Sequence, residues 1–182
     1  MDEAPEKVLA STDAYRGVFL RVQKDEVRLA SGKSAAREWI KHPGASVVAA
    51  KTEPGNFLLV RQWRHPLQRF FLEFPAGTRD GDEDWLSCAR RELFEETGFE
   101  TTTWKELGVI HPAIGYSNEA IFVFLAEGAK RIAPAPPDAD EISEVLEFSP
   151  QDLVRAIGKE ITDAKTLAVC ALAGLCPSYL PR

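Results

Sequence analysis

The sequence predicts an α/β sandwich, in which a mixed central sheet lies between helices, with a small antiparallel β extension before it. Three observations lead to this prediction. Short apolar runs alternate with helical patterns after residue 44, as they do in layered α/β domains. The longest helical pattern, over residues 82–97, contains no Gly or Pro. The residues before a His-Pro-Gly break at 42–44 show only strand patterns. We therefore expect an extension over residues 1–43 and a main domain over residues 44–182.

The extension has the pattern of three short strands. Residues 18–22 and 27–30 are expected to pair around a polar turn at residues 24–26. A third strand is expected over residues 36–41. Three short strands bury little apolar surface and make a poor independent domain. Their apolar faces are therefore expected to pack on the main domain or on a second subunit.

The main domain combines strand and helix patterns. Ser149 followed by Pro150 predicts the start of a helix, because proline is favoured at the first helical position. Thr162 and Asp163 are expected to begin a last helix that runs to about Leu175. A proline-rich stretch at 128–140 predicts a long loop. The expected strands cover residues 45–50, 57–64, 70–74, 104–110, 120–126 and 145–148.

Composition limits the classes of function. A chain of 182 residues suits one compact domain with an appendage, and 45% hydrophobic residues suffice for a sizeable core. The formal charge is −6 and Lys and Arg form no run, so neither nucleic acid nor a membrane surface is an expected partner. An acidic protein that binds an anionic substrate needs a bound metal or local positive charge.

Several segments bear on location. The acidic start of the chain has no apolar core, so we expect no signal peptide. No apolar run approaches the ~20 residues of a membrane-spanning helix. The three cysteines match no metal motif, and their odd number argues against a disulfide framework; Cys88 is expected in the core. These features together predict a cytoplasmic protein.

Residues 77–99 carry the strongest functional pattern. Asp82 is a suitable N-cap, and Gly98 stands where a left-handed residue commonly ends a helix. The helix between them has about four turns. Its apolar stripe, which is expected to face the core, consists of Leu86, Ala89, Leu93 and Phe94.

Glu92, Glu95 and Glu96 share another face of this helix, because their spacing is i, i+3 and i+4. Like charges at this spacing repel, and acids near a helix C-terminus oppose the helix dipole. A divalent cation such as Mg²⁺, which prefers oxygen ligands, would cancel the repulsion. For an isolated cluster of this kind, a solvated acidic face is the commoner alternative.

The cluster belongs to a longer pattern, Gly-x5-Glu-x7-Arg-Glu-apolar-x-Glu-Glu-x-Gly-apolar, which resembles the Nudix box at every specified position. A chance match in a chain of this length is on the order of one in a million. The resemblance implies the Nudix α/β/α fold and a Mg²⁺-dependent hydrolase that cleaves a nucleoside diphosphate linked to another group. The matching residues are Gly77, Glu83, Arg91, Glu92, Leu93, Glu95, Glu96, Gly98 and Phe99.

The segments around the box resemble the ADP-ribose pyrophosphatase branch of the Nudix family. They lie at residues 60–66, 73–77, 115–119 and 161–166. In that branch the N-terminal strands pack across a two-fold dimer and help to build the substrate pocket, which implies a homodimer here. One position departs from the branch: where many members have a proline that marks ADP-ribose enzymes, this sequence has Ile114.

The resemblance also implies the metal ligands. Glu92 and Glu96 would be the principal ligands of Mg²⁺, with Mn²⁺ as the alternative ion. Glu95 would add a further oxygen, and the backbone carbonyl of Ala76 would complete the set. Arg91 is expected to pair with Glu83 and to orient the carboxylates, a supporting role that tunes metal sites. An ordinary surface cation is the alternative for Arg91.

In this branch the general base is a carboxylate on a late loop. Glu141 is the first choice here and Glu144 the second, against the alternative of a solvated acidic loop. The Arg64 guanidinium is suited to bind the substrate diphosphate as a planar fork. Trp39 is suited to stack on a nucleobase, although a core tryptophan is an equal alternative. The substrate-binding residues expected from the resemblance are Arg64, Trp39, Glu73 and Glu119.

The expected reaction is the hydrolysis of ADP-ribose to AMP and ribose 5-phosphate. Another nucleoside diphosphate sugar, such as ADP-glucose or GDP-mannose, is the competing substrate. A Nudix-like module that binds the metabolite without cleaving it is the alternative of a different class. Such modules usually lose acids of the box, and here the box acids are all present.

Overall fold

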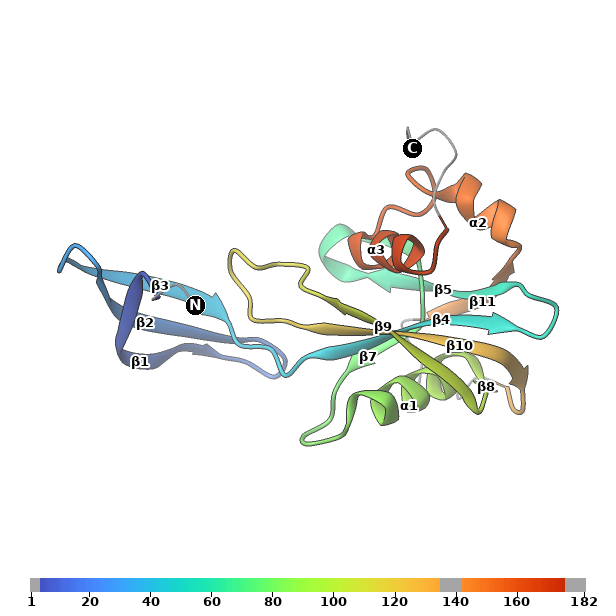
Figure 1. Ribbon diagram of the computed structural model, residues 1–182, viewed down its shortest axis with the longest axis horizontal. Helices are drawn as coiled ribbons and strands as arrows, with labels where there is room; N and C mark the ends of the chain where they lie inside the picture. The colour runs from blue at the N-terminus through green and yellow to red at the C-terminus, as the bar shows by residue number, and fades with distance from the viewer. Residues whose placement is uncertain (1–3, 135–141, 176–182) are drawn as a thin grey trace. The chain divides into compact units, whose positions relative to one another are not determined.

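The computed structural model describes residues 4–134 and 142–175 (Figure 1). The chain divides into two compact units. Of the described residues, one unit contains residues 4–44 together with Ala113–Glu119, and the other contains Ala45–Pro112, residues 120–134 and residues 142–175. No sequence pattern had indicated that Ala113–Glu119 belongs with the N-terminal strands.

The first unit is a three-stranded antiparallel sheet in the order β1-β2-β3. The strands are β1 (Glu6–Arg16), β2 (Arg21–Leu29) and β3 (Ser34–Ile40). The backbone of Ile40 exchanges hydrogen bonds with the segment Ala113–Glu119: its N–H donates to the Tyr116 carbonyl over 2.7 Å. The antiparallel extension predicted from the sequence is therefore present as three strands.

The predicted position of its first turn is wrong. Residues 24–26 lie in the middle of β2, and the chain turns at residues 17–20 instead. Lys24 and Glu26 are exposed while Asp25 between them is buried, which is the alternation of a strand with one covered face. Polarity alone therefore does not mark a turn at this place.

The second unit contains a sheet of eight strands. Its path runs β11-β5-β4-β10-β8, with β6 on β5, β7 on β4 and β9 on β10. The central pair β4–β10 is parallel and the other pairs are antiparallel, so the sheet is mixed as predicted. The strands are β4 (Ala45–Thr52), β5 (Phe57–Arg64), β6 (Arg69–Glu73), β7 (Ala76–Thr78), β8 (Phe99–Glu100), β9 (Thr103–Ile110), β10 (Ile121–Arg131) and β11 (Ile142–Phe148).

Helices cover both faces of this sheet. Helix α1 (Trp85–Thr97) lies on one face, and α2 (Pro150–Ala156) and α3 (Ala164–Leu172) lie on the other (Figure 1). Alternate residues of the central strands pack against the helices on opposite faces of the sheet, because successive side chains of a strand point to opposite faces. Val48 packs in the cluster of α1, whereas Val47 packs in the cluster of α2 and α3. The α/β/α sandwich is thus confirmed.

Several predicted boundaries move by a few residues. The N-cap of α1 is Asp84, not Asp82, and α3 ends at Leu172 rather than near Leu175. Strand β10 continues to Arg131, into the predicted loop, because Gly128 takes a left-handed φ of 67° at a bulge. Among the described residues, no helix is long and apolar enough to cross a membrane.

Candidate active site

Helix α1 is fixed at both ends, which places its carboxylates against β7. The Asp84 side chain accepts hydrogen bonds from the backbone N–H groups of Leu86 and Ser87. At the other end Gly98 adopts a left-handed φ of 74°, and its N–H donates to the Phe94 carbonyl. The buried residues of α1 include Cys88, as predicted, and also two of the three box glutamates.

Glu96 reaches from the last turn of α1 to the start of β7. Its carboxylate accepts a hydrogen bond of 2.9 Å from the Ala76 N–H. The residue is only 8% exposed. Burial, with a smaller contribution from the nearby Glu92 carboxylate, raises the pKa of Glu96 to about 8 against the opposing hydrogen bond from Ala76. A buried carboxylate of this kind is stabilised by a cation.

Glu92 lies one turn earlier and packs directly on Gly77. A Cβ added to Gly77 would lie 2.0 Å from the Glu92 carboxyl carbon, a distance that no pair of non-bonded carbon atoms adopts. Glycine at position 77 therefore makes the room that the carboxylate occupies. Burial raises the pKa of Glu92, although Arg91 opposes the shift.

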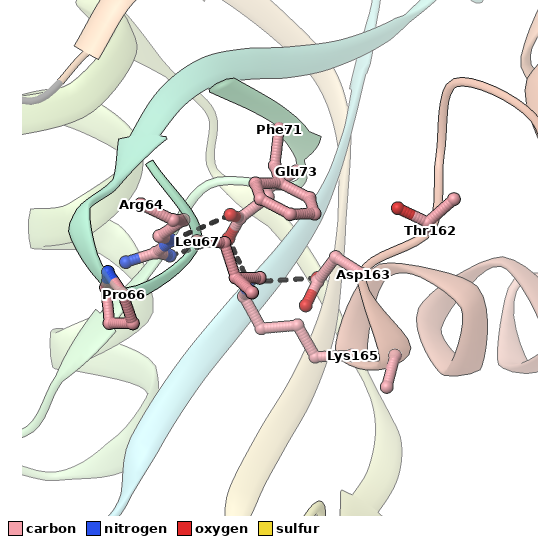
Figure 2. Close-up of a pocket in the computed structure, with 9 residues that line it drawn as sticks. Arg64, Pro66, Leu67, Phe71, Glu73, Thr162, Asp163 and Lys165 are labelled. Atoms are coloured by element: carbon pink, nitrogen blue, oxygen red, sulfur yellow. Dashed lines mark hydrogen bonds and ion pairs between the residues drawn. The ribbon is translucent and has the colours of Figure 1, made fainter. Parts of the chain in front are cut away.

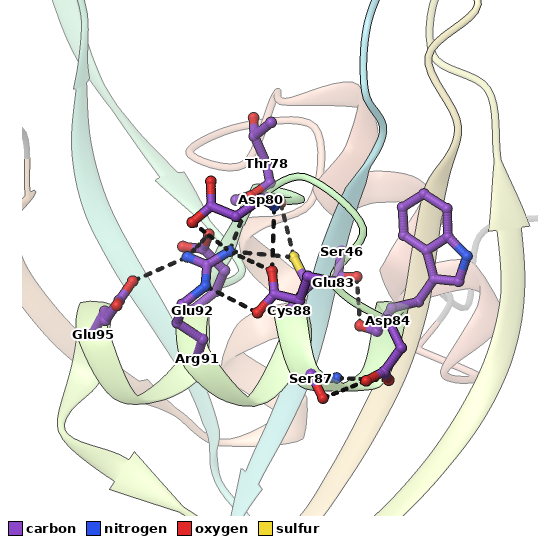
Figure 3. Close-up of polar contacts among 12 residues, drawn as sticks. Ser46, Thr78, Asp80, Glu83, Asp84, Ser87, Cys88, Arg91, Glu92 and Glu95 are labelled. Carbon is purple, nitrogen blue, oxygen red and sulfur yellow. Dashed lines mark hydrogen bonds and ion pairs between the residues drawn. The ribbon is translucent and has the colours of Figure 1, made fainter.

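Arg91 joins the acids of the box and the loop before it (Figure 3). Its guanidinium donates to Glu83 over 2.9 and 3.2 Å, so the predicted Arg91–Glu83 pair forms. It also donates to Glu92 over 2.6 Å and to Glu95 over 3.1 Å. A further hydrogen bond, to the Thr78 carbonyl over 3.0 Å, attaches the same group to β7. Arg91 is therefore not an isolated surface cation.

These contacts also shift the protonation equilibria. The hydrogen bond with Glu83 is the largest cause that raises the pKa of Arg91 above its ordinary value. The same hydrogen bond lowers the pKa of Glu83. Both groups are therefore held in their charged forms, and the Arg91 guanidinium stays available to Glu92 and Glu95.

The box carboxylates do not form a ready-made metal cage. Within residues 4–134 and 142–175, no group of three or more His, Cys, Asp or Glu side chains is arranged to hold a metal ion. The reason is visible in the contacts: Glu92 and Glu95 are directed to Arg91, and Glu96 to the Ala76 N–H. The ligand roles of Ala76, Glu92, Glu95 and Glu96 remain predictions.

Arg64 and Glu73 form a second polar group of the same unit (Figure 2). The Arg64 guanidinium donates to both carboxylate oxygens of Glu73, over 2.7 and 2.6 Å. Glu73 is 2% exposed, whereas the Arg64 side chain is 37% exposed. They line a cavity of about 450 Å³ together with Pro66, Leu67, Phe71, Thr162, Asp163, Ala164 and Lys165.

Lys165 and Asp163 complete this group. Both lie in the segment 161–166 that resembles the ADP-ribose pyrophosphatase branch, but neither was expected to be a site residue. The Lys165 ammonium donates to Glu73 and, over 2.9 Å, to Asp163. One signal was available: Glu73 stands in the apolar run Phe-Phe-Leu-Glu-Phe, and a buried acid requires cationic partners. The sequence did not show that Lys165 would be one of them.

Trp39 belongs to the first unit. Its indole N–H donates to Asp25 over 2.8 Å, and the half-buried ring lines a hollow of about 310 Å³ with residues 114–118. Glu119 lies in the same unit, with its carboxylate 3.7 Å from the His42 ring. The substrate contacts expected of Trp39 and Glu119 remain predictions.

The two residues expected to act as base differ in what the structure describes. Glu141 lies outside the described residues. Glu144 is exposed on β11, where it stands opposite Arg61 in the ladder with β5. The choice between these two carboxylates therefore remains a prediction.

Comparisons with known proteins agree with this architecture. A family model for the NUDIX domain matches residues 40–170. The ADP-ribose pyrophosphatase of Bacillus subtilis (strain 168) is 34% identical over 168 residues, which are 91% of this chain and 91% of that protein. The methanol dehydrogenase activator of Bacillus methanolicus is 34% identical over 164 residues, which are 89% of each chain.

A solved structure shows the same fold. The crystal structure of an ADP compounds hydrolase superposes with a TM-score of 0.81 and covers 96% of this chain and 95% of that one, at 16% identity. The chain belongs to the Nudix family and is a Nudix hydrolase. Within the family it falls in the branch that resembles ADP-ribose pyrophosphatases.

Proposed function

We propose that this protein hydrolyses the pyrophosphate bond of ADP-ribose and releases AMP and ribose 5-phosphate. The observation that carries the proposal is the placement of two buried box glutamates, Glu92 and Glu96, against the Ala76-Gly77 segment. Burial raises the pKa of both carboxyl groups, so both favour a cation nearby. An exposed acidic face, the alternative reading of the cluster, would not bury them.

The residues present fit a divalent cation. Glu92, Glu95 and Glu96 supply carboxylate oxygens and Ala76 a backbone carbonyl, which are ligand types that Mg²⁺ prefers, with Mn²⁺ as the alternative. When bound, such an ion neutralises charge on a diphosphate and makes a water more acidic. Arg91 would hold the side chains of Glu92 and Glu95 in place by the hydrogen bonds described above.

Arg64 supplies the positive charge that an acidic protein needs to bind a diphosphate. Its guanidinium lines the cavity and is oriented by the bidentate pair with Glu73. Trp39 and Glu119 are proposed as further substrate contacts. A carboxylate near the start of β11, Glu141 or else Glu144, is proposed to accept the proton of the attacking water.

The choice of ADP-ribose rests on the relatives. The ADP-ribose pyrophosphatase of Bacillus subtilis (strain 168) matches 91% of this chain. Ile114, at the position of the marker proline, is the specific reason to keep another nucleoside diphosphate sugar as a second candidate. Ile114 is 83% exposed and is not part of the core, so this position is free to differ without a change in core packing.

The test is a panel of substrates. The protein is incubated with ADP-ribose, ADP-glucose, GDP-mannose and dinucleotides, with and without Mg²⁺, and the products are identified. We expect the highest kcat/KM with ADP-ribose, AMP and ribose 5-phosphate as products, and no turnover when EDTA removes the metal. If another sugar nucleotide gives a higher kcat/KM, that nucleotide and not ADP-ribose is the preferred substrate.

We further propose that the protein acts as a homodimer in the cytoplasm. The first unit leaves large apolar side chains exposed on β1 and the following turn, including Val8, Leu9, Tyr15 and Phe19. Burying such a surface against a second copy would be favourable. Sedimentation at micromolar concentration is expected to give a dimer, and a monomer at that concentration would remove this proposal.

A further inference from the structure

The ion pair of Arg64 and Glu73 has a third member that the Nudix box does not account for. Lys165, at the start of α3, places its ammonium on the same Glu73 oxygen that accepts a hydrogen bond from Arg64. The Lys165 side chain is only 14% exposed. A lysine buried to this degree needs anionic partners, and here it has two, Glu73 and Asp163.

Lys165 therefore connects three separate parts of the second unit. Arg64 ends β5, Glu73 ends β6, and Asp163 is the N-cap of α3. The Asp163 carboxylate also accepts hydrogen bonds from the backbone and hydroxyl of Thr166, over 2.9 and 2.7 Å. The position of the Lys165 ammonium is thus set by a capped helix terminus rather than by a loose side chain (Figure 2).

The charges of this group balance only when Lys165 is present. Four charged residues line the cavity: the cations Arg64 and Lys165 and the anions Glu73 and Asp163. Their formal charges sum to zero. Without Lys165 the lining would carry one net negative charge. Glu73 would then be a buried carboxylate with Arg64 as its one remaining cation in this group. A diphosphate would be repelled more strongly, and the Glu73 carboxylate, against which Arg64 is oriented, would lose one of the groups that fix it.

We propose that Lys165 is a positioning residue: it fixes Glu73, and Glu73 in turn holds the Arg64 guanidinium in the orientation that binds the substrate diphosphate. The role in substrate binding rests on the proposed function, whereas the fixing of Arg64 by Lys165 does not. Lys165 itself touches neither the substrate nor the attacking water in this proposal. It acts by sharing Glu73 with Arg64.

The first test needs no substrate. In ¹⁵N-labelled protein, the Arg64 Nε–H group is assigned with the help of Arg64→Lys, and its hydrogen exchange rate is measured. Lys165→Met should increase this rate about tenfold, because Glu73, which accepts the hydrogen bond from this Nε–H, loses the charge-assisted bond from Lys165 that holds it in place. Lys165→Arg should restore the rate, because it supplies a new charge-assisted donor to Glu73. Lys130→Met is the control, because Lys130 forms an exposed pair with Glu53 away from this group.

The second test separates KM from kcat with ADP-ribose. Lys165→Met should raise KM about tenfold and leave kcat within about twofold, since an interaction equal in ground and transition states is weakened. In an Arg64→Ala background, Lys165→Met should change KM by less than about twofold, because the group through which it acts is missing. Lys165→Gln replaces Lys165→Met if the latter does not fold.

Two results would overturn the proposal. One is an unchanged Arg64 Nε–H exchange rate in Lys165→Met. The other is a KM increase that is equally large with and without Arg64, which would make Lys165 an independent contact. If the wild-type protein does not hydrolyse ADP-ribose, the proposed function fails, and the exchange measurement alone decides on Lys165.

Discussion

At the scale of single residues, the site depends on how closely neighbouring groups approach. Glu92 sits where a side chain on residue 77 would be, and Arg91 distributes its guanidinium among acids from the loop and the helix. The box pattern named these residues, and the Arg91–Glu83 contact could be predicted from it. The closeness of Gly77 and Glu92 could not, because it depends on how α1 packs on β7.

Gly77→Ala should displace the Glu92 carboxylate, because the new methyl group would overlap it. We expect kcat/KM to fall about 100-fold, as a misplacement near 1 Å can cause. Steady-state kinetics with Mg²⁺ check this expectation. Gly115→Ala is the control for stability, since an added Cβ there meets nothing within 4 Å. Unchanged kinetics in Gly77→Ala would mean that Glu92 has no fixed role.

Arg91→Lys should weaken metal activation, because a single ammonium cannot contact Glu83, Glu92 and Glu95 as the guanidinium does. We expect the Mg²⁺ concentration for half-maximal activity to rise by about 10- to 100-fold. Titration of activity with Mg²⁺ measures it. Arg155→Lys, at an exposed pair with Asp152, should leave the titration unchanged. An equal shift in both variants would contradict the role given to Arg91.

At the scale of elements, helix termini set the positions of the charged groups. Asp84 caps α1 and Asp163 caps α3, and each helix then presents charged side chains at the site. The sequence predicted both helices, and it expected α3 to begin at Thr162 and Asp163, next to its observed start at Ala164. It placed the cap of α1 two residues too early, because Asp82 and Asp84 are equally suitable by residue type and differ only in the geometry of the preceding loop.

Asp84→Ala should therefore destabilise the protein, whereas Asp82→Ala should not. Two backbone N–H groups lose their acceptor in the first variant, and none does in the second, since Asp82 is exposed and outside the cap. We expect the melting temperature to fall by about 2–4 °C for Asp84→Ala. Differential scanning calorimetry measures both. A larger decrease in melting temperature for Asp82→Ala than for Asp84→Ala would indicate that Asp82 is the N-cap instead.

Asp163 gives the stability of α3 a dependence on pH. Burial opposes its ionisation, but Lys165 and the hydrogen bonds from Thr166 outweigh burial, so the folded pKa lies below the ordinary value. A lowered folded pKa contributes stability above the unfolded pKa of about 3.9, and this contribution is lost as pH falls through the folded value.

Asp163→Asn should therefore cost about 1–2 kcal/mol of unfolding free energy near pH 7, because Asn can still cap the helix but loses the charge-assisted hydrogen bond from Lys165. The difference from the wild type should shrink as the pH falls below about 4. Urea unfolding at pH 7, 5, 4 and 3 measures the trend, with the exposed Asp82→Asn as control. A difference that stays constant over this range would show that the carboxylate charge is not what stabilises the helix.

At the scale of the whole molecule, the layered main unit could be predicted from sequence because strand and helix periods differ. The apolar residues of β4, β5 and β10 pack against helices on both faces of the sheet. All three segments were predicted to be strands. The N-terminal unit was predicted less well. Its strands bury few residues, so the apolar pattern that locates a turn is weak there.

The polar group around Lys165 shows the same limit at longer range. Its members come from positions 64, 73, 163 and 165, which only the folded sheet and helices bring together. A local motif such as the box can be read from consecutive residues. A site assembled across about a hundred residues needs the fold itself, and this is why Arg64 and Glu73 were expected from the sequence whereas the contacts of Glu73 with Lys165 and of Lys165 with Asp163 were not.

The central claim is that the buried glutamates of α1 bind a divalent cation for the reaction. Mn²⁺ binding, followed by electron paramagnetic resonance, tests it most directly in the wild type, in Glu96→Gln and in the exposed control Glu106→Gln. We predict that Glu96→Gln loses Mn²⁺ affinity by about 10- to 100-fold or more, while Glu106→Gln binds as the wild type does. Equal Mn²⁺ affinity in all three proteins would contradict the claim.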